Sequence, residues 1–283
     1  GGGSLDEVEE LAEQSQHTAA RMAGEETRYR LQRALPPIGP GSWRMAVSTL
    51  LNPMSHAPSA LMAGWLPRGF ISTKPISELV ERFVETDWPA HPNFWTVAAD
   101  YGSGKRVVFG RSDAPNARVG DAVAASCAIP SFYHPVKIAG KRYVDGGICS
   151  ASNLDLLRDE QLDLVVCLNP MSSLAEMTPR SPADRVAAAM RKQTGRRLGA
   201  EARKLRERGT KVLLVQPTAD DLAVMGPNLM ARGRREETIE RAIRTTARQL
   251  RRSRTREGVV LPSRTRRTQP RRTPVATPSR KAA

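Results

Sequence analysis

The sequence has few cysteines and no long apolar run. Its three cysteines are Cys127, Cys149 and Cys167. They do not have the spacing of metal ligands, and an odd number argues against a disulfide framework. All three stand among apolar or small residues, which predicts buried free thiols in a reducing compartment. No stretch of the sequence is long and apolar enough to cross a bilayer as a helix.

Phosphate-binding and metal-binding patterns are also missing. The run Gly102-Ser103-Gly104 stands between two expected strands, so it predicts a hairpin turn rather than a phosphate loop. Met225, Met230 and the other methionines are interpreted as core filling rather than as a cofactor site. We therefore expect no nucleotide, no metal and no other cofactor.

Acidic residues are scarce at the C-terminal end. Residues 251–283 hold ten Arg and one Lys against Glu257, and so contribute +10 of the net charge of +15. Large apolar residues are almost absent there, which predicts a disordered basic tail. Such a tail would attract an anionic membrane surface. Nucleic acid is the weaker expectation because the tail has no aromatic residue on which bases could stack, and a tail without a partner stays open.

The most informative pattern leads into Asp145-Gly146-Gly147. Residues 136–138 alternate apolar and polar, a turn follows at Ala139-Gly140, and residues 141–144 resume a strand. This pattern predicts two short strands that deliver one carboxylate into a glycine turn. The two glycines allow close approach of the backbone and positive φ angles. Taken alone, Asp-Gly-Gly is typical of an ordinary hairpin turn.

The longer string points to a family. Residues 124–130 (AASCAIP) precede residues 135–147 (PVKIAGKRYVDGG), and the whole run resembles the patatin-like phospholipase family, where such a stretch carries the catalytic aspartate. Flanking segments agree. Residues 95–109 are similar to a strand, turn and strand of that family, and residues 162–168 and 211–216 to core strands. The resemblance covers roughly residues 73–230.

The resemblance implies a fold and an activity. The fold is α/β, a three-layer patatin-like sandwich with a central, mostly parallel sheet. The activity is that of a serine hydrolase on lipid esters or phospholipids, of phospholipase A or lysophospholipase type, through a Ser–Asp dyad. Asp145 would be the catalytic base, Gly146 and Gly147 would position its carboxylate, and Asn153 and Asp155 would brace the next loop. The expected location is cytoplasmic, with attachment to the membrane periphery as an option.

The serine of such a dyad is not in this sequence. A serine nucleophile needs a base and oxyanion donors, and in this family it stands in a Gly-x-Ser-x-Gly elbow. Ser4, Ser42, Ser103 and Ser126 all lack glycine at one or both of the required positions. The chain also begins with Gly1 rather than Met, so we expect a partial domain that lacks its N-terminal strands and exposes apolar edges. The alternative is a catalytically inactive module that binds anionic membranes through its basic tail.

A histidine-based triad is a further option. The four histidines are His17, His56, His91 and His134. His91 and His134 each precede a proline, which predicts loop positions, and only His134 stands near the strand pair of Asp145. For each of the four we expect a surface or packing role.

The expected organisation has three parts. Residues 1–230 would form the partial patatin-like domain, residues 231–252 a basic helix and residues 253–283 the tail. Further helices are expected over residues 5–34, after Thr73, over residues 121–125 and over residues 182–208. The last would carry an apolar stripe of Val186, Met190, Leu198 and Leu205.

Residues 42–70 mix apolar side chains with prolines. Two interpretations remain open for this segment. It either covers the core or forms a mobile apolar lid over the active-site mouth.

Overall fold

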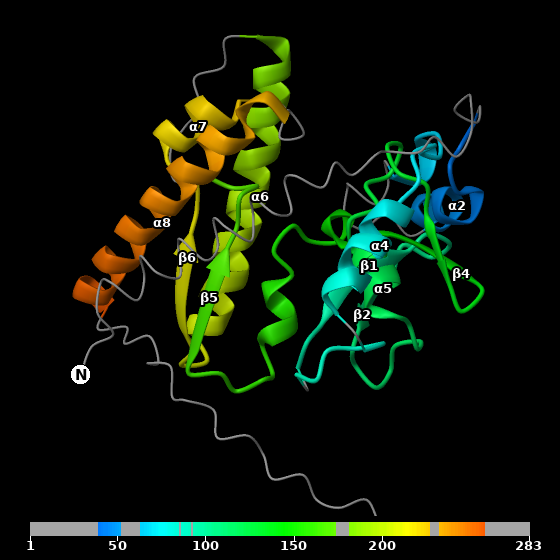
Figure 1. Cartoon of the computed structure of the whole chain (residues 1–283), viewed down its shortest axis with the longest axis horizontal. Coiled ribbons are helices and arrows are strands. Elements are labelled where there is room, and N and C mark those ends of the chain that lie inside the picture. Colours follow the sequence, from blue (N-terminus) through cyan, green and yellow to red (C-terminus); the bar gives the residue numbers. More distant parts are fainter. Residues whose placement is uncertain are drawn as a thin grey trace, which may run out of the picture.

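The structure is a computed structural model that describes residues 39–51, 63–84, 86–91, 93–173, 181–226 and 232–257. Figure 1 shows two groups of elements, one built on strands β1 to β4 and the other on β5 and β6. In chain order the elements are α2 (Trp43–Leu51), α4 (Lys74–Phe83), β1 (Thr96–Asp100), β2 (Arg106–Phe109), α5 (Val119–Ser126), β3 (Val136–Ile138), β4 (Lys141–Asp145), η2 (Gly146–Ile148), η3 (Leu154–Leu157), β5 (Leu164–Leu168), α6 (Pro182–Arg206), β6 (Lys211–Val215), α7 (Ala219–Met225), η4 (Arg232–Arg234) and α8 (Arg235–Glu257). The fold class is α/β, as expected.

Strands β1 to β4 form an antiparallel sheet in the order β2-β1-β4-β3. The β3–β4 hairpin turns at Ala139 and Gly140, whose φ angles are +45° and +78°. Two successive positive φ angles are typical of the type I′ turn, which matches the twist of paired strands. In the β1–β2 hairpin, the Asp100 carboxylate accepts hydrogen bonds from the N–H groups of Gly102 (2.7 Å) and Ser103 (3.2 Å). Both expected hairpins are confirmed.

Helix α5 covers one face of this sheet with apolar side chains. Tyr143 of β4 and Phe109 of β2 pack edge to face, with ring centroids 5.2 Å apart. Ala122 and Ala125 of α5 pack against them in the same buried cluster. The small side chains let the helix approach the sheet closely, which places the end of α5 beside the end of β4.

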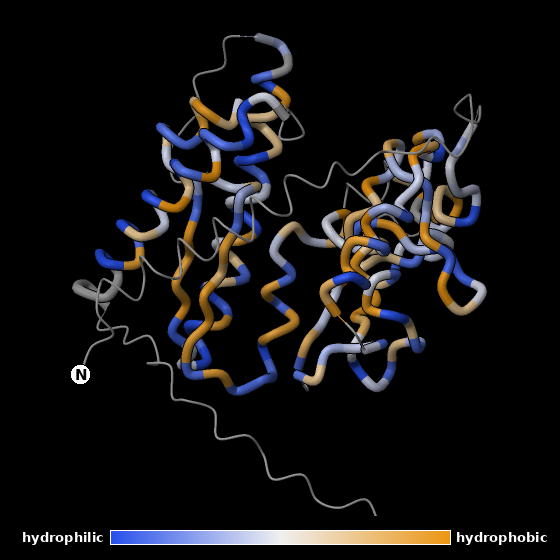
Figure 2. The backbone as a smooth tube through the Cα atoms, in the orientation of Figure 1, coloured by the Kyte–Doolittle hydropathy of each residue, from blue (hydrophilic) through white to orange (hydrophobic). Residues whose placement is uncertain are grey.

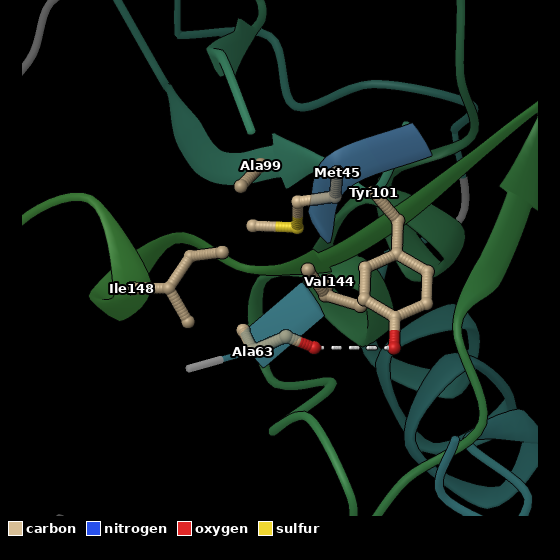
Figure 3. Close-up of a cluster of buried hydrophobic side chains, with 6 residues drawn as sticks. All are labelled: Met45, Ala63, Ala99, Tyr101, Val144 and Ile148. Atoms are coloured by element: carbon tan, nitrogen blue, oxygen red, sulfur yellow. Dashed lines mark hydrogen bonds between the residues drawn. The ribbon is translucent and has the colours of Figure 1, made fainter. Parts of the chain in front are cut away.

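The opposite face of the sheet is covered from α2. Met45 of α2 lies against Ala99 of β1 and Val144 of β4, and the Tyr101 hydroxyl donates a hydrogen bond to the carbonyl of Ala63 (Figure 3). Because side chains alternate along a strand, Val144 faces α2 while its neighbours on β4 face α5. The sheet is therefore covered on both faces.

Strands β5 and β6 form a parallel pair, and α6 connects them. Leu198 and Leu205 of α6 pack against Val165 of β5 and Val212 of β6 in a third buried cluster. A parallel pair needs such a crossover because its strands run in the same direction.

The ends of α6 follow from local sequence. Ser181 and Asp184 form a capping box, in which each side chain accepts a hydrogen bond from the backbone N–H of the other. Gly209, at φ +89°, closes the C-terminal end. The helix ends at Arg206 rather than at residue 208.

One face of β5 carries exposed apolar side chains. Val166 is 42% exposed and Leu168 is 67% exposed. Within the described ranges, β6 is the strand paired with β5. The expected exposure of apolar sheet edges concerns unpaired backbone edges and stays a prediction. Figure 2 shows mostly hydrophobic residues along β5 and β6, whereas hydrophilic and hydrophobic residues are mixed along α6 and α8.

The expected central, mostly parallel sheet is not found among the described residues. Four strands are antiparallel, and the parallel pair forms a separate sheet. The three-layer arrangement around one central sheet therefore stays a prediction.

Helix α4 begins after Thr73, as expected. Phe83 is exposed, whereas Ser77 is buried and donates a hydrogen bond to Asp121 of α5 at 3.0 Å. Gly120 permits this contact, because a Cβ at that position would lie 2.8 Å from the carbonyl oxygen of Ser77. The helix thus packs on α5, which in turn covers the sheet.

Two further expectations are corrected in part. In the stripe of α6, Leu198 and Leu205 are buried but Val186 and Met190 are exposed. Helix α8 continues to Glu257, five residues into the segment expected to be disordered. The expected helix over residues 5–34 and the tail from residue 258 lie outside the described residues, as do residues 52–62 of the expected lid. The boundaries of the three expected parts stay predictions.

Candidate functional site

Asp145 is the last residue of β4 and begins the loop that links the two groups of strands. It lies opposite Ala98 of β1, and its N–H donates a hydrogen bond to the carbonyl of Ala128 at 3.0 Å. The carboxylate accepts a hydrogen bond from the N–H of Gly147 at 2.6 Å. The residue is half-buried. Strand pairing, the turn after α5 and this bond together fix the position of the carboxylate.

The two glycines are required by close approach and not by positive φ. A Cβ at Gly146 would lie 2.4 Å from the carbonyl oxygen of Val97, and a Cβ at Gly147 would lie 2.9 Å from Oδ1 of Asp145. Neither glycine has a positive φ, because both belong to the η2 turn. The expected close approach is confirmed, and the expected positive φ is wrong.

The surroundings of Asp145 stabilise the protonated form of its carboxyl group, relative to the same group in water. Burial raises the pKa of Asp145, and the hydrogen bond from Gly147 opposes that rise in part. A carboxylate with a raised pKa is a stronger base, which suits a group that must take a proton from a hydroxyl.

Two cysteines lie in the electrostatic environment of Asp145. Partial burial raises the pKa of Cys127, and the Asp145 carboxylate raises it further. Burial also raises the pKa of Cys149, while the nearby Arg106 lowers it. Both are therefore thiols near neutral pH and are weak nucleophiles. All three cysteines are free, as expected, but none is fully buried: Cys149 and Cys167 are half-buried, and Cys127, which follows the end of α5, is exposed.

The loop after Asp145 is anchored to the second group by Glu201 of α6. The Glu201 carboxylate accepts hydrogen bonds from Ser150 (2.8 Å), Ser152 (2.5 Å) and the N–H of Leu154 (3.2 Å). It also pairs with Arg197 at 3.0 Å. Glu201 is 7% exposed, so these donors satisfy an almost fully buried charge. The sequence carries no local sign of this role, because an acid in the middle of a basic helix usually faces water.

A second set of contacts ties the loop to β2. Arg106 donates hydrogen bonds to both carboxylate oxygens of Asp155, at 2.8 and 2.6 Å, and one to Asn153 at 3.1 Å. The guanidinium holds the pKa of Asp155 below its usual range. Asn153 has φ +50°, a conformation that Asn tolerates better than most residues. The expected bracing positions thus form contacts on either side of the loop, although Arg106 was not foreseen as their partner.

The two described histidines make local contacts. Nδ1 of His134 lies 3.0 Å from the carbonyl oxygen of Pro135, and Nδ1 of His91 accepts a hydrogen bond from the N–H of Asn93. His17 and His56 lie outside the described residues. Local contacts of this kind agree with the expected packing roles.

Three of the serines considered for the elbow lie within the described residues. Ser103 lies in the β1–β2 turn, Ser126 ends α5, and Ser42 precedes α2. Neither Ser103 nor Ser126 stands at a turn from a strand into a helix, which is where a nucleophile elbow lies.

Two surface hollows lie beside this network rather than at Asp145. One, of about 260 Å³, is lined by Asp155, Arg158, Arg197, Glu201 and Lys204 among others. A wider hollow, of about 700 Å³, includes Arg106, Arg111, Lys141 and Tyr143. We give the geometry around Asp145 more weight for chemistry, because a hollow without a positioned base or nucleophile performs no acyl transfer.

The described part of the chain holds no group of three or more His, Cys, Asp or Glu residues that could bind a metal ion. Among its helices, none is both long enough and apolar enough to span a bilayer.

The segment that contains Asp145 matches a known protein family. The family model described as patatin-like phospholipase matches residues 16–158, half of the chain. No curated protein matches the sequence. The match starts well before residue 73, so the family likeness begins earlier than expected, and it ends before β5, so the expected coverage of residues 159–230 stays a prediction. It contains Asp145 and the loop up to Arg158, but not α6.

Proposed function

Because this chain belongs to the patatin-like phospholipase family, whose members are lipid acyl hydrolases, we propose that Asp145 is the general base of a Ser–Asp dyad that cleaves lipid esters. The observation that carries the proposal is the state of this carboxylate. It is half-buried at a strand end, held by the N–H of Gly147, and has a raised pKa.

In the proposed reaction, the serine hydroxyl attacks the acyl carbonyl carbon of a phospholipid or lysophospholipid while Asp145 accepts its proton. The C–O bond to the glycerol side then breaks, and that oxygen takes the proton from Asp145. A water molecule, deprotonated by Asp145, next hydrolyses the acyl-serine ester. One carboxylate thus serves as base and acid in turn.

The proposal requires a serine from outside these 283 residues, since the sequence has no Gly-x-Ser-x-Gly. The same absence favours a second candidate, a catalytically inactive module that binds anionic membranes through residues 251–283. The three-layer sandwich with a mostly parallel central sheet belongs to the first candidate, because an added elbow strand would pair with the edge of β5 opposite β6, which carries no strand among the described residues.

The first measurement is the intact mass and N-terminal sequence of the protein from its natural source. A longer protein with a Gly-x-Ser-x-Gly elbow supports the hydrolase. A mature protein that starts at Gly1, and that a fluorophosphonate probe does not label, supports the inactive module instead.

The role of Asp145 is tested in a serine-containing form of the protein. Asp145→Asn should lower kcat for phospholipid hydrolysis on the order of 10²–10⁴-fold, the usual contribution of a general base. The matched control is Asp159→Asn, since Asp159 is exposed and its ion pairs within the described part of the chain are with the surface residues Arg158 and Arg208. Unchanged turnover in Asp145→Asn would refute the role.

A further inference from the structure

We propose that α2 and residues 63–66 form a docking surface for an anionic phospholipid bilayer. The surface, here called the apolar platform, consists of the exposed side chains Trp43, Val47, Leu50, Leu51, Trp65 and Leu66. The choice of a lipid as the partner rests on the proposed function, whereas the platform itself rests on exposure, packing and charge.

Helix α2 has two apolar sides, and only one of them meets the protein. Met45 and Ala46 are fully buried, and Met45 lies against Ala99 and Val144 of the sheet (Figure 3). Trp43 is 64% exposed, Leu50 67% and Leu51 72%. Together with position 47, these residues follow the spacing i, i+4, i+7, i+8, which places them in one stripe along the helix. A helix needs only one such stripe to pack on a core, so the second one has no role inside the described protein.

Residues 63–66 extend the stripe sideways. The indole rings of Trp43 and Trp65 pack edge to face with centroids 6.4 Å apart. The N–H of Gly41 donates to the carbonyl of Leu66 at 2.9 Å, and a Cβ at Gly64 would lie 2.9 Å from the backbone nitrogen of Ala46. Backbone contact this close makes the two segments one surface.

The charges around the platform select an anionic partner. Arg44 is exposed beside the stripe on α2. On the hairpin, Arg142 shares the α2-facing side of the sheet with Val144, and Lys137 lies opposite Arg142 in the strand register; both are exposed. The sequence from Thr27 to Ser77 contains no Asp or Glu. Lys and Arg side chains near an anionic membrane surface are attracted to it, and the attraction grows with their number.

A bilayer interface suits this combination better than a protein partner does. Tryptophan side chains favour the headgroup level, where the ring is buried and its N–H stays hydrated, and flanking cations meet lipid phosphates. Figure 1 shows α2 at the outer edge of the first group, on the side away from α6, α7 and α8. The platform would therefore bring the β1–β4 sheet, which carries Asp145, next to the lipid.

The test reads Trp fluorescence quenching by vesicles whose acyl chains carry bromine. The four tryptophans lie at positions 43, 65, 88 and 95, and residues 258–283 contain none. Quenching therefore reports insertion of the platform and not binding of the basic tail. We expect mixed phosphatidylcholine–phosphatidylserine vesicles to quench the full chain, and pure phosphatidylcholine vesicles to quench it far less.

Three variants make the result specific. The double variant Leu50→Asp with Leu51→Asp keeps all four tryptophans. It should raise the lipid concentration required for half-maximal quenching at least tenfold. Arg44→Glu should weaken quenching for the anionic vesicles only. Val186→Asp with Met190→Asp, which changes two exposed apolar residues on α6, should leave it unchanged. Far-ultraviolet circular dichroism confirms that each variant is folded.

Several results would overturn the proposal. They are no quenching of the wild-type chain, equal quenching by neutral vesicles, or unchanged quenching in the double Leu variant. Dimerisation that depends on Leu50 and Leu51, measured by light scattering without lipid, would assign the platform to a second copy of the chain. Because quenching needs no turnover, it can succeed while Asp145→Asn refutes the proposed chemistry, and the reverse also holds.

Discussion

The two groups of strands differ in how completely the faces of their sheets are covered. The β1–β4 sheet has apolar clusters on both faces, supplied by α5 and by α2. The β5–β6 pair buries one face under α6, and on the other face Leu213 and Val215 of β6 are buried beside α8 while Val166 and Leu168 of β5 are exposed. The family match ends at residue 158, so it covers the first group and not the second. The group that carries the family motif thus covers both faces of its sheet, whereas the second group leaves the β5 part of one face exposed.

The second group nevertheless contributes to the candidate site. Glu201 lies outside the family match, yet it holds the loop that follows Asp145. The comparison shows that a motif can be recognised from one part of a chain while the loop behind it depends on another. Four predictions test this division, from the largest expected effect to the smallest.

Glu201→Ala should be the most damaging change, because it leaves the donors of Ser150, Ser152 and Leu154 without an acceptor. We expect the free energy of unfolding to fall by about 3 kcal/mol, measured by urea denaturation. Glu201→Gln is the matched variant, and it should lose less because its amide oxygen still accepts hydrogen bonds. A loss below about 1 kcal/mol in Glu201→Ala would mean that the two groups are not coupled through this residue.

Arg106→Lys should weaken the link between β2 and the loop. Lysine cannot hold both oxygens of Asp155 and the amide of Asn153 at once, so we expect a loss of about 1 kcal/mol, discounted for the partial exposure of the pair. The pKa of Asp155 is lowered in the folded state, so its contribution is present above the unfolded pKa. The difference between wild type and variant should therefore disappear as the pH falls through the folded pKa of Asp155. A difference that does not change with pH would argue against an ionic origin.

Asp145→Asn should stabilise the fold slightly while it removes the base. Burial raises the pKa of Asp145, so ionisation of this group opposes folding, and asparagine still accepts the Gly147 hydrogen bond. We expect a gain of about 0.5–1 kcal/mol at neutral pH, measured by thermal or urea unfolding. The gain should be absent below the unfolded pKa of about 3.9, where both states are protonated, should grow as the pH rises from the unfolded to the folded pKa, and should be complete above the folded pKa. A destabilised variant at neutral pH would show that the carboxylate is held for structure.

Leu168→Thr should have the smallest effect. The side chain is largely exposed on β5 and threonine suits a strand, so we expect a change within about 0.5 kcal/mol by the same denaturation measurement. The control is Val165→Thr on the covered face of β5, which should cost more. A large loss in Leu168→Thr would mean that another part of the protein covers this face, and the contrast between the two groups would then disappear.

Local patterns predicted much of the first group. Three features depend only on residues that are close in sequence: the Ala139-Gly140 turn, the Gly102–Gly104 turn and the start of α4. The backbone preferences of those residues therefore predicted them. Asp145 at a strand end followed from the same alternation. What such patterns missed are contacts between distant segments, such as Glu201 with Ser150 and Arg106 with Asp155. No local propensity encodes these pairs.

The sequence by itself determined the α/β class, the hairpins and the position of the family motif, because turn residues and strand alternation act over a few residues. Tertiary structure alone decided which helix face was buried. It placed Ser77 rather than Phe83 of α4 against a neighbour, and it left half of the α6 stripe and one side of α2 exposed. An apolar stripe states that a face can be buried, but only the arrangement of the other elements supplies the surface that buries it.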